Sequence, residues 1–493
     1  MQISHLSAEC VPFAKTGGLG DVVGALPKFL AARGHDLSVF LPFHLEAANW
    51  FRKRDTWPET AVEPYDVWVY GHKYTVGLLK SLLPGSLVPT YFVAQDELFH
   101  RGSIYAGNEN GEDDGLWRFT FFVRAAVEGM KRLGMRPDVI HSHDWHPALA
   151  PMLGAWQSWR EPWWDTVASV LTVHNIAYQG VYPLSEFPIL GLPDGVAHGG
   201  NVEFGGALNL LKGALVAADM INAVSPTYAR ELMTRDGGFG LDGILRSRGE
   251  RVTGILNGID TAVWNPSTDT LIAANYDAAD LTGRDACRAE LCRVAGFEAG
   301  DPGFILGAVG RLTSQKGFDL LLSTVPELTR RGIRIVMLGS GEPALEESMR
   351  RLESQTKGRF RAFVGYDESG AHKIEAGVDA FVMPSRFEPC GLSQMYSLAY
   401  GTPPIVRRTG GLADSVNGFD GGNLDTATGF VFEDASAHAL AASVLFAQRV
   451  FFHKELWGRI VSNGMAQDFS WSRSAERYET LYRKAREVRG LPW

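Results

Sequence analysis

The sequence predicts an α/β protein built from two doubly wound domains. Short apolar segments alternate with amphipathic segments along most of the chain, which is typical of parallel sheets with helices on both faces. The chain has 493 residues, more than one hydrophobic core usually serves, which is roughly 250–300 residues. The alternation also restarts after residue 300. We therefore expect one such domain in each half.

The first half supplies the strands and helices of the first domain. Residues 117–133 are the clearest helix, because Phe121, Phe122 and Ala125 fall on one face with other apolar side chains. A second helix is expected at 22–33, and Ser225-Pro226 starts another. The expected strands are 3–8, 36–42, 68–70, 90–94, 139–141, 169–173, 220–224 and 252–256.

The second half repeats the pattern after a polar connection. Residues 261–300 are rich in Ala and Asp and contain the breaker Asn265-Pro266, so we place the domain connection there. A helix is expected at 318–331, after the first strand of the second domain. The expected strands are 304–309, 334–338, 361–364, 380–383 and 404–406.

Composition limits the classes of function. Hydrophobic residues make up 45% and charged residues 21%, as in ordinary globular proteins. The formal net charge of −9 argues against nucleic acid as the main partner. Four cysteines are too few for a disulfide framework and indicate a reducing cytoplasm. With no apolar stretch of about 18 residues and no leader pattern before the first strand, we expect no membrane span and no targeting segment.

A glycine-rich loop, Lys15-Thr16-Gly17-Gly18-Leu19-Gly20-Asp21, lies between an expected strand and an expected helix. Backbone N–H groups at a helix N-terminus favour an anion, and Lys15 adds positive charge. The loop suits a diphosphate or the sugar attached to one, although an ordinary strand–helix turn has the same residues. The second half repeats Thr-Gly-Gly-Leu at 409–412, again followed by Asp and Val at the same spacing, which suggests two similar halves.

Polar residues also follow other strands, at the edge of a parallel sheet where ligands bind. Glu9, Asp144 and His174 lie there. His141, His143, Asp144 and His146 resemble a metal cluster, but Trp145 breaks the spacing of binuclear zinc hydrolases, so we favour Asp144 and Trp145 as sugar contacts. Helix capping or burial in the core are the structural alternatives for these histidines, and His174-Asn175 is open to either interpretation.

In the second half, Arg311 and Lys316 flank a loop after a strand. A planar guanidinium and an ammonium suit two phosphates, whereas two solvated surface cations are the alternative. Glu388 lies at a strand-to-helix junction, where a carboxylate accepts hydrogen bonds from sugar hydroxyls, and the amides of 391–393 open a helix. The chain contains no P-loop and no clean G-x-G-x-x-G after a strand.

Five motifs together resemble the bacterial glycogen synthase and plant starch synthase family. They are Lys15-Thr16-Gly17-Gly18-Leu19, Thr172-Val173-His174-Asn175, Gly310-Arg311-Leu312, Gln315-Lys316-Gly317 and Glu388-Pro389-Cys390-Gly391-Leu392, in family order over residues 1 to about 480. The resemblance implies a GT-B fold, with two Rossmann-like domains facing each other across a cleft. It implies an acceptor-side domain at 1–260, a nucleotide-sugar domain at 261–475, and a helix at 476–493 that packs back on the first domain.

The resemblance also implies a retaining transfer of glucose from ADP-glucose to the non-reducing 4-hydroxyl of an α-1,4-glucan, without a metal or another cofactor. Front-side displacement fits this outcome, with the leaving phosphate taking the acceptor's proton. The residues implied at the reacting centre are His174, Glu388, Arg311 and Lys316. Those implied in binding ADP-glucose are Lys15, Gly17, Gly18, Asp21, Gln315, Tyr366, Cys390, Gly391, Leu392 and Ser393, where Tyr366 stacks near adenine. Those implied in binding the glucan are Glu9, Tyr105, Asp144, Trp145 and Asn175.

Three other functions remain open at this point. A related transferase would use UDP-glucose or a different acceptor. A catalytically silent protein would bind glucan, with tryptophan rings available for sugar stacking. A glucan phosphorylase is disfavoured, because no lysine context marks a pyridoxal phosphate site. The oligomeric state cannot be predicted from the sequence.

Overall fold

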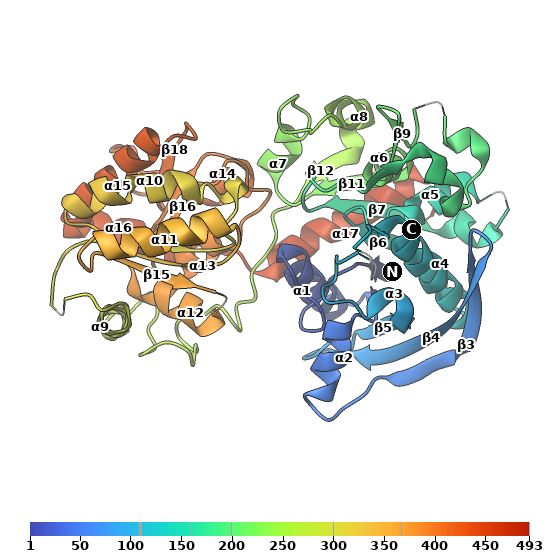
Figure 1. Ribbon diagram of the computed structural model, residues 1–493, viewed down its shortest axis with the longest axis horizontal. Coiled ribbons are helices and arrows are strands. Elements are labelled where there is room, and N and C mark those ends of the chain that lie inside the picture. Colours follow the sequence, from blue (N-terminus) through green and yellow to red (C-terminus); the bar gives the residue numbers. More distant parts are fainter. Residues whose placement is uncertain (108–110, 159, 199, 299, 366, 493) are drawn as a thin grey trace. The chain divides into compact units, whose positions relative to one another are not determined.

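The computed structural model describes residues 1–107, 111–158, 160–198, 200–298, 300–365 and 367–492. The chain forms two compact units, each built around its own sheet (Figure 1). The N-terminal unit consists of Met1–Gly258 together with Trp471–Trp493, and the C-terminal unit consists of Ile259–Ser470. No helix of the described ranges is long and apolar enough to cross a membrane. All four cysteines are buried, and none of them forms a disulfide with another described residue.

The main sheet of the N-terminal unit has nine strands among the described residues, and most of them are parallel. The strand β1 lies at its centre, where Ile3 pairs with Leu37 of one neighbour and Val139 of the other. From one edge to the other, the strands are β12 (Val252–Gly254), β11 (Met220–Ala223), β7 (Ala168–Val173), β6 (Val139–His143), β1 (Gln2–Leu6), β2 (Asp36–Pro42), β5 (Pro89–Ala94), β4 (His72–Leu82) and β3 (Glu59–Val69).

One edge of this sheet differs from the sequence prediction. The strands β3 and β4 form an antiparallel hairpin, and β4 also runs antiparallel to β5. The turn between them is Tyr70-Gly71, and both residues have positive φ, as tight hairpins require. The prediction of parallel pairing alone is therefore wrong here. The sequence prediction recognised only the end of β3, because that strand begins with exposed polar residues. The strand β4 was not predicted.

Helices cover the sheet of the N-terminal unit. The helix after the glycine-rich loop begins at Gly18, earlier than the predicted Val22, so the second glycine of the loop is its first residue. The remaining elements include a small antiparallel sheet, β8-β10-β9, that the sequence did not predict. The helices and short strands are α1 (Gly18–Ala32), α2 (Leu45–Arg52), α3 (Asp96–Phe99), α4 (Gly115–Arg132), α5 (Leu149–Trp156), η1 (Pro162–Thr166), β8 (Val181–Pro183), η2 (Leu184–Leu190), η3 (Asp194–Val196), β9 (Glu203–Phe204), β10 (Ala207–Asn209), α6 (Leu210–Ala217), α7 (Pro226–Glu231), α8 (Asp242–Arg248) and η4 (Gly249–Arg251).

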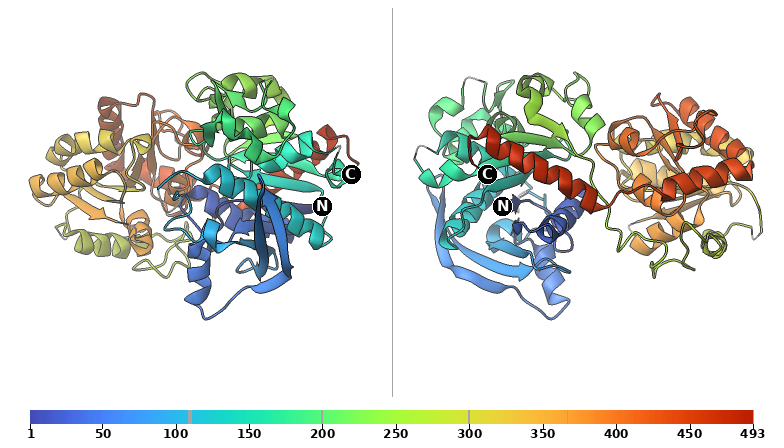
Figure 2. Two further views of the ribbon diagram at one scale, coloured as in Figure 1. Left: turned by 45° about the vertical axis from the view of Figure 1, so that its right-hand side comes forward. Right: turned by 180° about the vertical axis from the view of Figure 1, so that it is seen from behind.

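The last helix, α17 (Trp471–Val488), belongs to the N-terminal unit although the C-terminal unit precedes it in sequence. Seen from behind, it lies across the face of the N-terminal unit (Figure 2). Trp471, Tyr478 and Tyr482 are buried in the same core as Ile3 and Leu26. This helix therefore completes the core beneath β1 and its neighbours.

The C-terminal unit has a fully parallel six-stranded sheet among its described residues. The parallel arrangement and five of the strands were predicted, and the edge strand Phe430–Phe432 was not. The stretch 261–300, which we predicted as a connection, contains a helix that packs within this unit. In sheet order the strands are β15 (Phe360–Val364), β14 (Arg334–Gly339), β13 (Ile305–Val309), β16 (Ala380–Met383), β17 (Pro404–Arg407) and β18 (Phe430–Phe432). The helices are α9 (Gly283–Ala295), η5 (Ser314–Lys316), α10 (Phe318–Arg330), α11 (Pro343–Gln355), α12 (Glu368–Gly377), α13 (Ser393–Ala399), α14 (Gly410–Ser415), α15 (Ala437–Phe451) and α16 (Lys454–Met465).

Candidate active site

The glycine-rich loop of the N-terminal unit is held by the side chain of Glu9. This carboxylate is buried; its Oε2 accepts hydrogen bonds from the backbone N–H groups of Thr16 at 2.7 Å and Gly17 at 3.0 Å. Its Oε1 accepts bonds from the Thr16 hydroxyl at 2.6 Å and the Tyr105 hydroxyl at 2.5 Å. Two of the N–H donors that we expected to face an anion are therefore occupied by the protein's own carboxylate.

The face of the loop at Gly17 is open. A Cβ atom added there would meet nothing within 4 Å, and the backbone has φ −153°, a conformation that any residue adopts. Lys15 forms an ion pair with Asp21 at 2.7 Å, and both side chains are partly exposed. Gly17 is thus not required by local packing, and the free space beside it is where a ligand can approach the backbone closely.

The predicted acceptor residues are brought together at the carboxyl ends of β1, β6 and β7. The ring of Tyr105 stacks on His146 at 4.8 Å, and the ring of Trp145 lies 4.2 Å from the same imidazole. Asp144 follows β6 with φ +58°, a left-handed conformation that is uncommon outside glycine. Glu9 joins this group through the Tyr105 hydroxyl, and the Tyr105 and Trp145 rings both contact the same residue, His146.

Asp144 fixes the backbone at the end of β7, where the fifth residue, Asn175, lies. Its Oδ1 accepts hydrogen bonds from the N–H groups of His174 at 2.6 Å and Asn175 at 3.3 Å. Burial raises the pKa of the Asp144 carboxyl to about 7, while these two N–H groups act in the opposite direction. The strained turn at Asp144 is therefore part of what positions His174.

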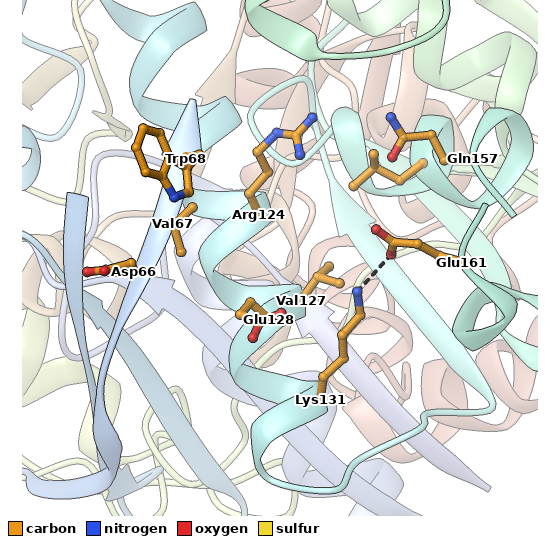
Figure 3. Close-up of a pocket in the computed structure, with 10 residues that line it drawn as sticks. Asp66, Val67, Trp68, Arg124, Val127, Glu128, Lys131, Gln157 and Glu161 are labelled. Carbon is orange, nitrogen blue, oxygen red and sulfur yellow. Dashed lines mark hydrogen bonds and ion pairs between the residues drawn. The ribbon is translucent and has the colours of Figure 1, made fainter. Parts of the chain in front are cut away.

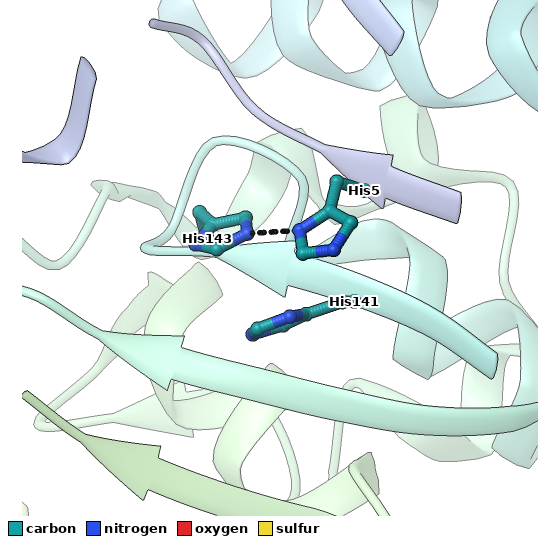
Figure 4. Close-up of side chains that lie close together, drawn as sticks. All are labelled: His5, His141 and His143. Carbon is teal, nitrogen blue, oxygen red and sulfur yellow. Dashed lines mark hydrogen bonds between the residues drawn. The ribbon is translucent and has the colours of Figure 1, made fainter. Parts of the chain in front are cut away.

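Four histidines, His5, His141, His143 and His174, lie close together at this edge, and Figure 4 shows the first three. His5 Nδ1 lies 3.0 Å from His143 Nε2, and His143 Nδ1 lies 3.0 Å from His174 Nε2. His141 is hydrogen-bonded instead to the hydroxyls of Tyr482 at 2.9 Å and Thr172 at 2.7 Å. Burial lowers the pKa of His5 and of His174 to about 3, and it lowers the pKa of His141 and His143 well below the usual range. These rings are neutral at physiological pH.

The metal hypothesis concerned a different set of side chains from the one that the structure brings together. His5, His141 and His143 have ring nitrogens within 4.8 Å of one another, whereas the sequence pattern suggested His141, His143, Asp144 and His146. Five of the six ring nitrogens of the first three are already in hydrogen bonds, and His5 Nε2 is buried without a partner. A metal ion would have to replace these hydrogen bonds.

In the C-terminal unit, two loops after β13 and β16 are joined at the carboxyl ends of the strands. Lys316 Nζ pairs with Glu388 Oε2 at 2.6 Å, and the Ser385 hydroxyl donates to the same oxygen at 3.0 Å. Gln315 donates to the Phe387 carbonyl at 3.3 Å. Arg311 is exposed, and its guanidinium has no hydrogen bond or ion pair to the chain within the described ranges. At this edge of the sheet, Lys316 is therefore held in place by Glu388, and the Arg311 side chain is available to bind a ligand.

The segment after Glu388 opens helix α13, as predicted. Ser393 is its first residue, Cys390 is buried, and Gly391 has φ +71° beside the Gln394 side chain. The backbone N–H of Gly411 in the second Thr-Gly-Gly-Leu motif donates to the Glu388 carbonyl at 3.1 Å. Tyr366, predicted near adenine, lies outside the described residues.

Sequence reasoning missed three contributors to this edge. Thr16 and Ser385 supply hydroxyls to the two buried carboxylates, and His5 begins the histidine chain. Thr16 lies within the glycine-rich motif and Ser385 lies three residues before Glu388, so their positions were a usable signal. His5 lies alone in a strand of mixed polarity, and the sequence contained no signal that it belongs to the site.

A separate pocket of about 220 Å³ lies between β3, α4 and α5 (Figure 3). Trp68 stands at its rim, and an ion pair between Lys131 and Glu161 at 2.7 Å crosses part of it. None of the predicted site residues lines it. It is therefore distinct from the strand-end sites described above.

Comparison with known proteins gives consistent matches over the whole chain. Residues 2–247 match the starch synthase catalytic domain, and residues 303–448 match the glycosyl transferases group 1 domain. A glycogen synthase of Koribacter versatilis is 43% identical over 493 residues, covering 99% of both chains. A glycogen synthase of Anaeromyxobacter sp. is 42% identical over 487 residues, covering 98% of this chain and 99% of its own.

Solved structures match as well. The catalytic domain of starch synthase IV from Arabidopsis thaliana, bound to ADP and acarbose, has a TM-score of 0.88 and 33% identity, with 99% of both chains covered. Sucrose-phosphate synthase from Thermosynechococcus elongatus has a TM-score of 0.57 and 18% identity, with 98% of both chains covered, and this likeness bears on the fold alone.

Proposed function

The chain belongs to the glycogen synthase and starch synthase family of glycosyltransferases, and on that premise we propose that it transfers glucose from ADP-glucose to an α-1,4-glucan. The glucose joins the 4-hydroxyl at the non-reducing end with retention of anomeric configuration. The reaction takes place in the cytoplasm, a location supported by the four buried cysteines, none of which forms a disulfide in the described part of the chain.

The C-terminal unit binds the donor in this proposal. The exposed guanidinium of Arg311 is available for the diphosphate, and Lys316 adds a second cation whose position is fixed by Glu388. Gln315 and Tyr366 bind the adenosine, and Glu388 also accepts hydrogen bonds from glucose hydroxyls. The N–H groups at 391–393 face a phosphate oxygen at the start of α13.

The N-terminal unit binds the transferred glucose and the acceptor. Gly17 and Gly18 give the glucose close contact with the backbone, with Lys15 and Asp21 beside them. Trp145 and Tyr105 supply ring faces for the glucan, and Asp144 and Asn175 supply polar groups. Glu9 contributes mainly by holding the loop and the Tyr105 hydroxyl, because its carboxylate accepts four hydrogen bonds from these groups.

The chemistry proposed is front-side displacement. The bond between the anomeric carbon and the phosphate oxygen breaks first, and the positive charge develops on the sugar ring. The leaving phosphate takes the proton of the acceptor hydroxyl, so no protein base is needed. The protein contributes orientation and electrostatic stabilisation, which usually provide the largest share of rate enhancement. The low pKa of His174 supports a mechanism without a protein base, because a ring with a pKa of about 3 is a poor proton acceptor.

The observation that carries this proposal is the pairing of Lys316 with buried Glu388 at the ends of β13 and β16, beside Arg311, whose side chain has no partner among the described residues. The purified chain is incubated with ADP-glucose and glycogen, and ADP release and growth of the non-reducing ends are measured. We expect ADP release that depends on glycogen and exceeds UDP release from UDP-glucose. Glucan binding without ADP release would support a silent binding protein instead, and a preference for UDP-glucose would support the related transferase.

Treatment with EDTA tests the expectation that no metal takes part. Activity is expected to be unchanged, because in this proposal Arg311 and Lys316 neutralise the negative charge of the donor diphosphate. Loss of activity that added zinc restores would instead point to the histidine group. A dialysed sample without EDTA serves as the control.

A further inference from the structure

The rings of His5, His143 and His174 form a continuous hydrogen-bonded chain that runs from the core to the carboxyl edge of β7. Both links are 3.0 Å between nitrogens, and His5 and His143 are stacked at 5.3 Å with an angle of 16°. His5 and His143 are fully buried, whereas His174 reaches the edge with 9% of its surface exposed. The chain thus links a buried end to an end that a ligand can reach.

The two links are coupled, because a neutral imidazole carries one proton. If His143 donates from Nδ1 to His174, its Nε2 must accept from His5 Nδ1–H. If His143 donates from Nε2 to His5, its Nδ1 must accept from His174 Nε2–H. Both hydrogen bonds therefore point in one direction, either outward toward His174 or inward toward His5.

The surroundings of His5, at the buried end of the chain of rings, indicate which way the two hydrogen bonds point. His5 Nε2 is buried and has no partner in the described part of the chain. In the inward arrangement this atom carries the proton of His5, which leaves an orphaned N–H donor in the core, and such donors are rare in folded proteins. In the outward arrangement Nε2 is an unprotonated acceptor, also without a partner among the described residues, and unpaired acceptors are better tolerated than unpaired N–H donors. Every proton on the three rings except that of His174 is then used in a hydrogen bond.

We propose that His5 and His143 are positioning residues that hold His174 in the neutral form protonated at Nδ1, so that His174 presents an N–H donor to a hydroxyl of the glucosyl group. This role rests on the proposed function, whereas the protonation pattern does not. Nδ1 of His174 makes no hydrogen bond to the described residues, and Asp144 fixes the backbone of the same residue at 2.6 Å. His174 accordingly binds the sugar as a donor, with Nε2 committed to His143.

The protonation pattern is tested by nitrogen-15 NMR of the full chain without substrate, with His174→Gln used to assign the His174 signals. We expect a protonated Nδ1 and an unprotonated Nε2 on His174. A protonated Nε2 overturns the proposal. Because no substrate is present, this result stands apart from whether ADP-glucose is the donor.

The functional consequence is tested with His143→Phe and His143→Asn. Phenylalanine keeps a ring but breaks both links, and we expect kcat to fall about ten- to a hundred-fold with little change in the KM for ADP-glucose. Asparagine offers an amide that donates to His174 Nε2, so most of the activity returns. The NMR signature of His174 is expected to shift in the first variant and to be retained in the second.

His141→Phe is the matched control. His141 lies in the same group of rings, 4.2 Å from His143, but its nitrogens bond Tyr482 and Thr172 outside the chain of three. We expect it to leave the His174 protonation unchanged even if it lowers stability. An equal loss of kcat in His141→Phe and His143→Phe, or no rescue by asparagine, would assign His143 a packing role only.

Discussion

The two Thr-Gly-Gly-Leu motifs, at 16–19 and 409–412, have the same residues and open helices α1 and α14, but their glycines serve different purposes. At Gly17 a side chain would meet open space. At Gly410 and Gly411 a Cβ would overlap the carbonyl oxygens of Glu388 and Cys390. The first motif keeps space for a ligand, and the second lets two loops of the protein pack against each other.

The means of support differ as well. In the N-terminal unit, the side chain of Glu9 holds the backbone N–H groups of Thr16 and Gly17. In the C-terminal unit, the backbone carbonyl of Glu388 accepts from Gly411 N–H, which leaves the Glu388 side chain for Lys316. The first motif is therefore held by the carboxylate of a glutamate, and the second motif is held by the main-chain carbonyl of a glutamate.

The largest expected effect is that of Lys316→Ala. It removes an oriented cation, and we expect a loss of about 3–4 kcal/mol in transition-state stabilisation, roughly a hundred- to a thousand-fold in kcat/KM. The second motif stays packed, because its contact is with the Glu388 carbonyl. Steady-state rates with ADP-glucose and glycogen measure the effect. Lys131→Ala, which breaks a lysine–glutamate pair of 2.7 Å at the separate pocket, is the control expected to keep full activity.

Next in size is the effect of Gly411→Ala on stability. The added methyl group overlaps the Cys390 carbonyl, and overpacking of this kind costs about 3 kcal/mol. Unfolding in urea, followed by a probe in the C-terminal unit, measures the loss. Gly458→Ala in α16, where a Cβ meets nothing within 4 Å, is the matched control and is expected to be at least as stable as the original chain. Equal stability of both variants would remove the packing role of the second motif.

A smaller effect is expected from Glu9→Gln. The amide has one acceptor oxygen and cannot serve the four donors that the carboxylate serves, so we expect a loss of about 2 kcal/mol in stability and a higher KM for ADP-glucose. Tyr105→Phe removes only one of those donors and should cost less. If Glu9→Gln instead raised only the KM for glucan and left the KM for ADP-glucose unchanged, Glu9 would contact the acceptor directly.

The smallest change in stability is expected from Gly17→Ala. The extended backbone and the open space accept a methyl group, so the free energy of unfolding should change by less than about 0.5 kcal/mol. Donor binding should nevertheless weaken, and the KM for ADP-glucose reports it. A stability loss as large as that of Gly411→Ala would show that the two motifs serve the same purpose.

Much of the fold could be predicted because it depends on local patterns. Apolar runs such as 36–42 and 380–383 became strands at the predicted residues, and the helix at 318–331 was placed to within one residue. The hairpin β3–β4 was not predicted, because its pairing depends on a turn with positive φ at Tyr70 and Gly71 rather than on apolar alternation.

The candidate site was predictable in its location and less so in its contacts. The rule that ligands meet the carboxyl ends of parallel strands singled out Glu9, Asp144 and His174, which follow β1, β6 and β7 in the structure. It could not show that Glu9 is turned toward Thr16, or that His5 contacts His143, 138 residues away. Such contacts depend on which strands become neighbours in the sheet, information that no single stretch of sequence contains.

The position of α17 has a consequence for biosynthesis. The N-terminal unit emerges first from the ribosome, yet Tyr478 and Tyr482, which fill its core, are translated after the entire C-terminal unit. Until then His141 lacks the Tyr482 hydroxyl and a large apolar surface stays uncovered. The N-terminal unit can therefore complete its core only after the C-terminal unit, which is continuous in sequence, has been synthesised.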